Sequence, residues 1–206
     1  MAIENIPNKN TNEFSLSSNV KKQLDNLGLS VDMVRGNILD VGAGDAEFAR
    51  AFAGKKEAKI TSVDRNPNKE NDNFVIVADS RSLPFPDNSY DMVISHASIP
   101  HIFLDLYSFD FPEGSLENIR SAIARSFSEI LRVLKEGKKA YMAPIGIGYV
   151  YDSEKTVKKA IFEELENLKK MGIHFEFEFI ETYENPDNKE ITDLFRLIIQ
   201  KPEKNR

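Results

Sequence analysis

The feature that most constrains this chain is residues 38–46, where an apolar run meets an acidic residue and then a glycine turn. The sequence there is ILDVGAGDA, with Gly42 and Gly44 in the turn and a helical pattern after it. Glycines let the backbone turn tightly and let a ligand approach it closely. A junction of strand, glycine turn and helix predicts an α/β protein with a pocket of nucleotide size.

Two more acidic residues end β-like runs further along the chain. Asp64 follows the run at residues 59–63, and Asp79 follows the run at residues 74–78. Ligands of parallel α/β sheets bind at the carboxyl ends of the strands. We therefore expect Asp40, Asp64, Asp79 and Ser95 to lie along one edge of the sheet.

The order of the remaining patterns predicts the fold class. Strands that alternate with helices indicate a parallel sheet with right-handed crossovers, and the last two runs, with only a turn between them, indicate an antiparallel hairpin. We expect an α/β, Rossmann-like, doubly wound sheet of seven strands, mostly parallel. The expected strands are residues 37–41, 59–63, 74–78, 90–95, 139–143, 175–179 and 194–200.

Three details of this prediction concern particular residues. Gly137 is expected to end the helix before the fifth strand, and Pro144 to stop that strand. Phe175, Phe177 and Phe179 alternate with glutamates, which predicts that all three phenylalanines belong to the core.

Length and composition narrow the class of protein. The 206 residues suit one domain, expected at residues 13–206 after a flexible polar arm at residues 1–12. The net charge of −6 gives no overall basic field and argues against a nucleic-acid partner. The chain has no cysteine, which excludes disulfides, cysteine-ligated metals and a cysteine nucleophile, and no metal site is expected.

The sequence also bears on location. The first residues contain no basic region followed by an apolar run, and no apolar stretch is long enough to span a membrane. We therefore expect a cytoplasmic protein without a membrane partner. The sequence carries no indication of the oligomeric state.

The residues around the glycine turn indicate the chemistry of the ligand. A dinucleotide fingerprint has glycines at its first, third and sixth positions, but Glu47 stands at the sixth and would repel a pyrophosphate. A ligand without phosphates fits better. Asp64 can accept hydrogen bonds from both hydroxyls of a ribose, and Asp79 can accept one from the amine of a purine.

Further groups complete the description of this ligand. Asp40 or Asp45 can face a positively charged group, and Leu83 can pack on a purine base. A ribose, an adenine, an ammonium group and a carboxylate without phosphates together describe S-adenosylmethionine. We expect this molecule as the cofactor.

With these motifs the chain resembles the class I S-adenosylmethionine-dependent methyltransferases, and most closely the group often called type 11. The resemblance covers residues 37 to about 145 by motif and continues to the end of the chain by order of elements. The matching segments are ILDVGAGD at 38–45, SVD at 62–64, ADS at 78–80, LPFPDNSYDMVIS at 83–95 and EILRVLKEG at 129–137.

The resemblance implies a set of cofactor-binding residues along the expected edge. In it Asp64 binds the ribose hydroxyls, Asp79 binds the adenine amine with the Ser80 backbone beside it, and Asp40 lies near the ammonium group. Gly42 and Gly44 lie under the methionine moiety. The full set is Asp40, Gly42, Ala43, Gly44, Asp45, Asp64, Arg65, Asp79, Ser80, Leu83, Ser95 and His96.

The chain departs from the family pattern at three places, one of which is a short and polar second crossover at residues 66–73. Ala46 stands where a third glycine is frequent, a mild change that we expect to be tolerated. Residues 95–98 read SHAS, which differs from the Asn/Asp-Pro-Pro-aromatic motif of methylases that act on nucleic-acid bases or glutamine. This difference argues against those substrates.

Two histidines are candidates for catalysis. Methyl transfer mainly requires a nucleophile held in line with the methyl group, and a general base only where the acceptor must lose a proton. His96 and His101 are the candidate bases, because a neutral imidazole suits this role near pH 7. The alternatives are a packing or surface role for His101 and a contact to the cofactor for His96. The aromatic residues at 96–114 are either a substrate lid or local packing.

We therefore expect a methyltransferase that acts on a small-molecule acceptor. A protein or RNA methyltransferase is a less favoured alternative. A non-catalytic scaffold or partner subunit of the same fold stays open, although the intact Gly42, Gly44, Asp64 and Asp79 argue against it. Glu47 disfavours a nicotinamide-dependent oxidoreductase.

Overall fold

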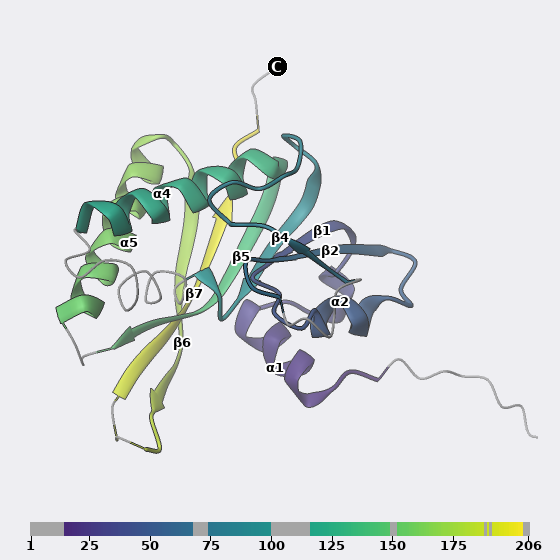
Figure 1. The fold of residues 1–206 in the computed structure, drawn as a ribbon, viewed down its shortest axis with the longest axis horizontal. Helices are drawn as coiled ribbons and strands as arrows, with labels where there is room; N and C mark the ends of the chain where they lie inside the picture. The colour runs from purple at the N-terminus through teal and green to yellow at the C-terminus, as the bar shows by residue number, and fades with distance from the viewer. Residues whose placement is uncertain are drawn as a thin grey trace, which may run out of the picture.

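A seven-stranded sheet with helices on both sides forms the frame of the protein (Figure 1). The computed structural model describes residues 15–67, 74–99, 116–148, 152–187, 189 and 191–203. The strands are β1 (Gly36–Val41), β2 (Ala58–Asp64), β3 (Val75–Val77), β4 (Tyr90–His96), β5 (Leu134–Gly148), β6 (His174–Glu184) and β7 (Ile191–Gln200). The α-helices are α1 (Ser18–Leu27), α2 (Glu47–Phe52), α4 (Leu116–Val133) and α5 (Asp152–Lys170), and a 3₁₀ turn covers Val31–Met33.

The strand order is β3-β2-β1-β4-β5-β7-β6. The first five strands in this order run parallel, whereas β7 is antiparallel to both β5 and β6. The predicted α/β, Rossmann-like, mostly parallel sheet with a carboxyl-terminal antiparallel hairpin is confirmed. The parallel arrangement brings the carboxyl ends of β1, β2, β3 and β4 to one edge.

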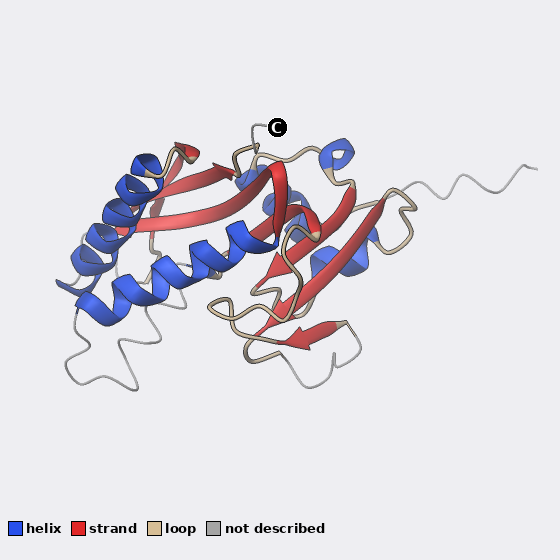
Figure 2. Ribbon diagram, turned by 90° about the horizontal axis from the view of Figure 1, so that it is seen from above, coloured by secondary structure: helices blue, strands red, loops and turns tan. Residues whose placement is uncertain are grey.

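Two hydrophobic cores lie on the two faces of the sheet. Side chains alternate along β1, so Leu39 packs into a core with α4 and α5, whereas Ile38 packs into a core with α1 and α2. Figures 1 and 2 show α4 and α5 lying together on one side of the sheet. The apolar stripes of α4 and α1 account for this arrangement, with Phe127 and Leu24 as buried members.

The helix α1 is held at both ends by side chains. Ser17 precedes it, and its hydroxyl accepts a hydrogen bond from the Val20 N–H at 3.2 Å. At the other end, Gly28 is left-handed, and Arg196 of β7 donates to the main-chain carbonyl of Asn26 at 2.8 Å. These contacts fix α1 against β7 and near the carboxyl end of β4.

The expected boundaries of β5 and the preceding helix were wrong. The helix α4 ends at Val133, the strand begins at once, and Gly137 lies within β5. The strand also continues through Pro144, where the pairing with β7 shifts register between Met142 and Ile145. A proline has no N–H to donate, and this irregularity is the place in a strand where it is tolerated.

The expected burial of the phenylalanines in β6 was also wrong in part. Phe175 and Phe177 are half-buried, but Phe179 is 57% exposed. The strand β6 is an edge strand, and Phe179 lies beside the register shift with β7. Phe177 packs against Phe162 of α5, whereas the described ring contact of Phe179 is with Phe195 of β7.

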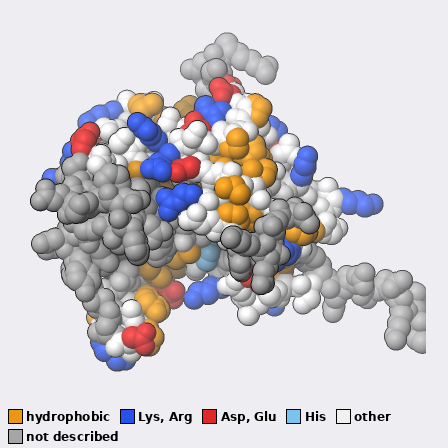
Figure 3. Space-filling model, viewed as in Figure 1, with side chains coloured by type: hydrophobic (Ala, Val, Ile, Leu, Met, Phe, Trp, Pro, Cys, Tyr) orange, Lys and Arg blue, Asp and Glu red, His pale blue; other side chains and the backbone are white. Residues whose placement is uncertain are grey.

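The opposite edge of the sheet also exposes apolar side chains. Phe74, Ile76 and Val77 of the β3 region are 51%, 44% and 69% exposed. Figure 3 shows apolar side chains gathered in a band on one face of the molecule.

None of the described helices has the length and apolar character needed to cross a membrane. The arm expected at residues 1–12 lies outside the described residues, and the single domain at 13–206 stays a prediction.

The loop between β3 and β4 is anchored to α4 by one arginine and one glutamate. Arg132 donates to the carbonyls of Phe85 at 2.7 Å and Leu83 at 2.9 Å, and also to Asp87 at 2.8 Å. Glu129 pairs with Arg132 at 2.7 Å and accepts from the Leu83 N–H at 2.7 Å. The Arg132 hydrogen bond keeps the pKa of Glu129 below its ordinary value. The motif at residues 129–137 therefore orients the loop that follows Asp79.

Replacing Arg132 with alanine should lower the free energy of unfolding by about 2–3 kcal/mol, because two loop carbonyls and Glu129 lose charged donors. Urea unfolding followed by circular dichroism measures the change. The control is Arg120→Ala, which removes one surface ion pair with Glu163 and should change the free energy by less than about 1 kcal/mol. Equal effects of the two substitutions would contradict the anchoring role.

Candidate cofactor site

The glycine turn is bonded to the end of the neighbouring strand. The N–H groups of Gly42 and Ala43 both donate to the carbonyl of Val63, at 2.8 and 3.0 Å. The Gly44 N–H donates to the carboxylate of Asp64 at 2.9 Å. The turn therefore takes its shape from β2, and the first two acidic strand ends are held in one frame.

Two features require a glycine at position 42: its backbone conformation and the closeness of a neighbouring side chain. Its φ is +74°, in the left-handed region, and a Cβ there would overlap the side chain of Ser98. Ser98 follows β4 and is buried. Ser98 was not among the predicted site residues, although its place just past the carboxyl end of β4 indicates this edge of the sheet.

A pocket of about 240 Å³ opens beside the turn, at the carboxyl ends of β1, β2, β3 and β4. Five residues of the predicted set line it: Gly42, Asp64, Arg65, Asp79 and Ser80. The other lining residues are Val41, Asn66, Ala78, Ala97 and Ser98. The strand ends that the sequence pattern predicted are therefore together in one pocket.

The carboxylate of Asp64 is oriented by two main-chain donors. Oδ2 accepts from the Gly44 N–H at 2.9 Å, and Oδ1 accepts from the Asn66 N–H at 2.8 Å. A carboxylate oxygen has two acceptor positions. Each oxygen of Asp64 therefore retains one acceptor position, and the pair suits two adjacent hydroxyl groups.

The carboxylate of Asp79 is bound by a neighbouring arginine. Arg81 donates from Nε to Oδ1 at 2.9 Å and from Nη2 to Oδ2 at 2.6 Å. The hydrogen bonds from Arg81 hold the pKa of Asp79 below its ordinary value, although partial burial opposes them. Asp79 is therefore an ionised acceptor. Ser80, the next residue, is buried and shares a hydrogen bond with Ser126 of α4 at 3.0 Å.

Asp40 lies beneath the turn and outside the lining of the pocket. It is 4% exposed. Burial, followed by the nearby charge of Asp64, raises its pKa to about 7. A carboxyl group with this pKa exchanges its proton near neutrality, and a cationic group brought close would ionise it.

The other predicted residues lie outside the lining of the pocket. Asp45 and Gly44 are exposed, and Ala43 is half-buried. Leu83 is buried in the core shared with α4, and the Ser95 hydroxyl is buried without a hydrogen-bond partner among the described residues. The roles of these residues stay predictions.

Of the two candidate catalytic histidines, the structure describes His96 but not His101. His96 faces α1, and its Nε2 lies 3.1 Å from Nδ2 of Asn26. Burial, with a smaller effect of Lys22, lowers the pKa of His96 and favours the neutral ring. His101 and most of the aromatic stretch at 96–114 lie outside the described residues. Catalysis by either histidine stays a prediction.

Ala46 precedes α2 as its N-cap, and Glu47 is the first residue of this helix. Ala46 has a φ of 51° and is fully buried. A left-handed residue with a Cβ carries strain of about 1–2 kcal/mol, and the tolerance of alanine here stays a prediction. Glu47 accepts from the Ser17 hydroxyl at 2.7 Å and from the Asn19 amide, so α1 binds the carboxylate at this helix start. These hydrogen bonds lower the pKa of Glu47.

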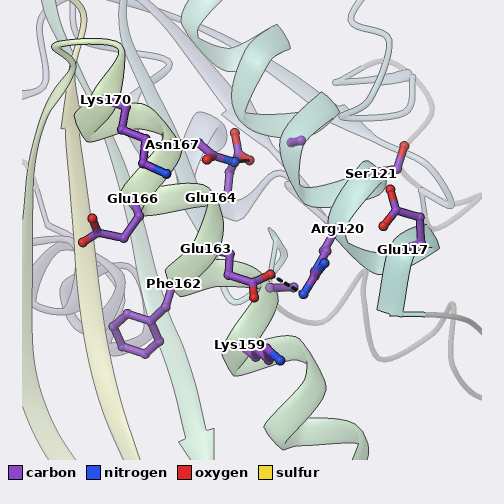
Figure 4. Close-up of a pocket in the computed structure, with 12 residues that line it drawn as sticks. Glu117, Arg120, Ser121, Lys159, Phe162, Glu163, Glu164, Glu166, Asn167 and Lys170 are labelled. Atoms are coloured by element: carbon purple, nitrogen blue, oxygen red, sulfur yellow. Dashed lines mark hydrogen bonds and ion pairs between the residues drawn. The ribbon is translucent and has the colours of Figure 1, made fainter.

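A larger cavity, of about 690 Å³, lies elsewhere, between α4 and α5 (Figure 4). Its wall carries mixed charges, and Arg120 pairs with Glu163 at 2.6 Å. None of the strand-end acids lines it. The smaller pocket at the strand ends is therefore the candidate site.

Among the described residues, no group of three or more histidine, aspartate or glutamate side chains is arranged to hold a metal ion.

Comparison with known proteins identifies the family. The family model described as a methyltransferase domain, Methyltransf_11, matches residues 39–142, half of the chain. The chain belongs to this family of class I methyltransferases, as the motifs predicted. The cofactor of the family is S-adenosylmethionine, which confirms the expected cofactor class. No protein of curated function matched the sequence.

Solved structures with the same fold include two whole-chain matches. An S-adenosylmethionine-dependent methyltransferase from Methanosarcina mazei is 15% identical, with a TM-score of 0.57 over 92% of this chain and 100% of that one. A complex of a Haloferax volcanii methyltransferase with its activator Trm112 gives 18% identity and a TM-score of 0.55, over 90% of this chain and 92% of that one.

A third solved structure is a larger enzyme. Phosphoethanolamine N-methyltransferase 2 of Haemonchus contortus, in complex with phosphomonomethylethanolamine and S-adenosylhomocysteine, is 20% identical with a TM-score of 0.55. The match covers 90% of this chain and 52% of the nematode enzyme. This chain therefore spans about half the length of that relative, and the similarity shows a shared fold.

The buried Asp40 makes stability depend on pH. Its folded pKa of about 7 lies above the ordinary value of 3.8, so between these values the folded chain keeps a proton that the unfolded chain has released. Stability should therefore fall as the pH rises from about 4 to 7. Asp40→Asn should raise the free energy of unfolding at pH 8 by about 2–4 kcal/mol and change it little at pH 4. Urea unfolding at both pH values measures this, and an equal change at both would exclude the assignment.

Proposed function

We propose that this chain binds S-adenosylmethionine and transfers its methyl group to a small-molecule acceptor. The observation that carries the proposal is the pocket in which Asp64 and Asp79 line the same wall beside the Gly42 turn. Two acceptor positions on Asp64 suit the two ribose hydroxyls. The ionised Asp79 suits the adenine amine.

The residues of this chain would bind and orient the cofactor. When bound, the cofactor supplies a methyl group already activated by its sulfonium. The chain's contribution is to hold the nucleoside at Asp64 and Asp79 and the methionine moiety over Gly42, so that the methyl group faces the acceptor. Positioning of this kind can lower a barrier by roughly 7–11 kcal/mol. Asp40, beneath the turn, would ionise beside an ammonium group.

His96 is the described candidate for proton removal from the acceptor. It ends β4, and its lowered pKa favours a neutral ring at pH 7. The amide nitrogen of Asn26 can only donate, so Nε2 accepts from it and the neutral ring carries its proton on Nδ1. His96 would therefore take up a proton at Nε2, in exchange for its contact with Asn26. A general base is needed only where the acceptor loses a proton in the reaction.

Two observations support a small acceptor. The net charge of −6 provides no overall attraction for nucleic acid. The structural relative from Haemonchus contortus is in complex with the small amine phosphomonomethylethanolamine. A protein or RNA acceptor is the alternative that the experiment below separates.

Titration calorimetry tests cofactor binding directly. S-adenosylmethionine and S-adenosylhomocysteine should bind with a Kd in the range of about 1–100 μM, and NAD should not bind. Asp64→Asn should weaken S-adenosylhomocysteine binding by about tenfold or more, because one charged acceptor of the ribose hydroxyls is lost. Lys169→Gln, at an exposed position of α5 outside the pocket lining, is the control with unchanged affinity. Binding of NAD alone would refute the proposal.

Methyl transfer from radiolabelled S-adenosylmethionine tests the acceptor class. Counts should appear in small molecules from a metabolite extract and not in protein or RNA fractions offered separately. Transfer to a protein or RNA fraction alone would replace the small-molecule acceptor by that class. Cofactor binding without transfer to any fraction would favour the non-catalytic scaffold.

A further inference from the structure

The turn after β3 is built around the side chain of Asp79. The Ser82 N–H donates to the main-chain carbonyl of Asp79 at 3.0 Å, and the Arg81 N–H donates to its Oδ1 at 2.8 Å. An aspartate that binds the N–H two residues on forms a compact turn of its own. The turn brings the Arg81 side chain back alongside the carboxylate that starts it.

The guanidinium of Arg81 then takes both oxygens of that carboxylate. Nε donates to Oδ1 at 2.9 Å and Nη2 donates to Oδ2 at 2.6 Å. This is the fork-to-fork geometry that fixes a carboxylate in orientation as well as in charge. With the main-chain bond counted, Arg81 fills both acceptor positions of Oδ1 and one of the two on Oδ2.

One acceptor position of Asp79 therefore remains, on Oδ2. Asp79 and Ser80 line the pocket beside Asp64, and the Asp79 side chain is 28% exposed there. An ionised carboxylate accepts hydrogen bonds and donates none. A single fixed acceptor favours a ligand that presents an N–H and rejects one that presents an oxygen at the same place.

We propose that Arg81 is a positioning residue for base recognition, which holds the Asp79 carboxylate so that its remaining acceptor selects the exocyclic amine of adenine. The inference rests on the proposed binding of S-adenosylmethionine. It adds a residue that the expected cofactor-binding set did not contain. Arg81 acts through Asp79, and its own side chain need not touch the cofactor.

A purely structural role of Arg81 makes a different prediction. An ion pair that is one-third exposed contributes little to stability, so a substitution would change the melting temperature slightly and leave base preference unchanged. A positioning role changes the preference between bases. The preference is therefore the quantity to measure.

Calorimetric titration with S-adenosylhomocysteine and S-inosylhomocysteine measures this preference. The second compound carries a carbonyl oxygen in place of the adenine amine. The unsubstituted protein should prefer the adenine compound by about 10- to 100-fold, because the carbonyl would meet the free acceptor of Asp79. Arg81→Gln and Arg81→Lys should each weaken S-adenosylhomocysteine binding about tenfold and reduce the preference to about threefold or less. The lysine keeps the charge but lacks the fork.

A matched control and a double substitution complete the test. Arg120→Gln removes an ion pair of similar exposure on α4, away from the pocket, and should leave affinity and preference unchanged. In an Asp79→Asn background, Arg81→Gln should have no further effect on binding, because Arg81 acts through that carboxylate.

Three results would overturn the inference. The first is an unchanged preference in both Arg81 variants, and the second is an additive effect in the double variant. The third is loss of folding in both Arg81 variants, read from the melting curve, which would assign Arg81 a structural role. If the unsubstituted protein bound neither compound, the proposed function itself would fail, and that outcome is distinct because it appears before any substitution.

Discussion

The site depends on the bonds between the glycine turn and the end of β2. One carbonyl, that of Val63, accepts two N–H groups of the turn, and the Asp64 carboxylate accepts a third. Because these donors belong to the main chain, no side chain of the turn has to supply them. The same bonds that shape the turn orient Asp64, so the carboxylate proposed to bind ribose and the turn proposed to lie under the methionine moiety cannot be placed independently.

Much of the frame followed from local patterns. The apolar runs predicted the first four parallel strands to within one residue at each end, and parallel topology alone forces Asp64 and Asp79 to one edge. Local patterns failed where contacts between distant segments determine where a strand ends or whether a side chain is buried. Pro144 is accommodated by a register shift with β7, and Phe179 is exposed although Phe177, in the same strand, packs against Phe162 of α5. Neither condition can be read from the neighbouring residues.

The candidate site was predicted in part for the same reason. The strand-end acids were identified from their positions, but the groups that orient them were not. Glu129 and Arg132 reach a loop more than forty residues earlier in the chain, and Asn26 reaches His96 across seventy residues. The raised pKa of Asp40 likewise depends on burial under the assembled turn. These effects arise only once the sheet and its helices are packed.

The exposed edge at β3 has a consequence for how the protein behaves at high concentration. The β3 region presents Phe74, Ile76 and Val77 to solvent, and within the described chain no strand pairs with its outer side. An apolar edge with unpaired backbone groups is a template for association between chains. A short segment next to the candidate pocket therefore favours association on storage or crystallisation, and a charge placed there should act on solubility before it acts on the fold.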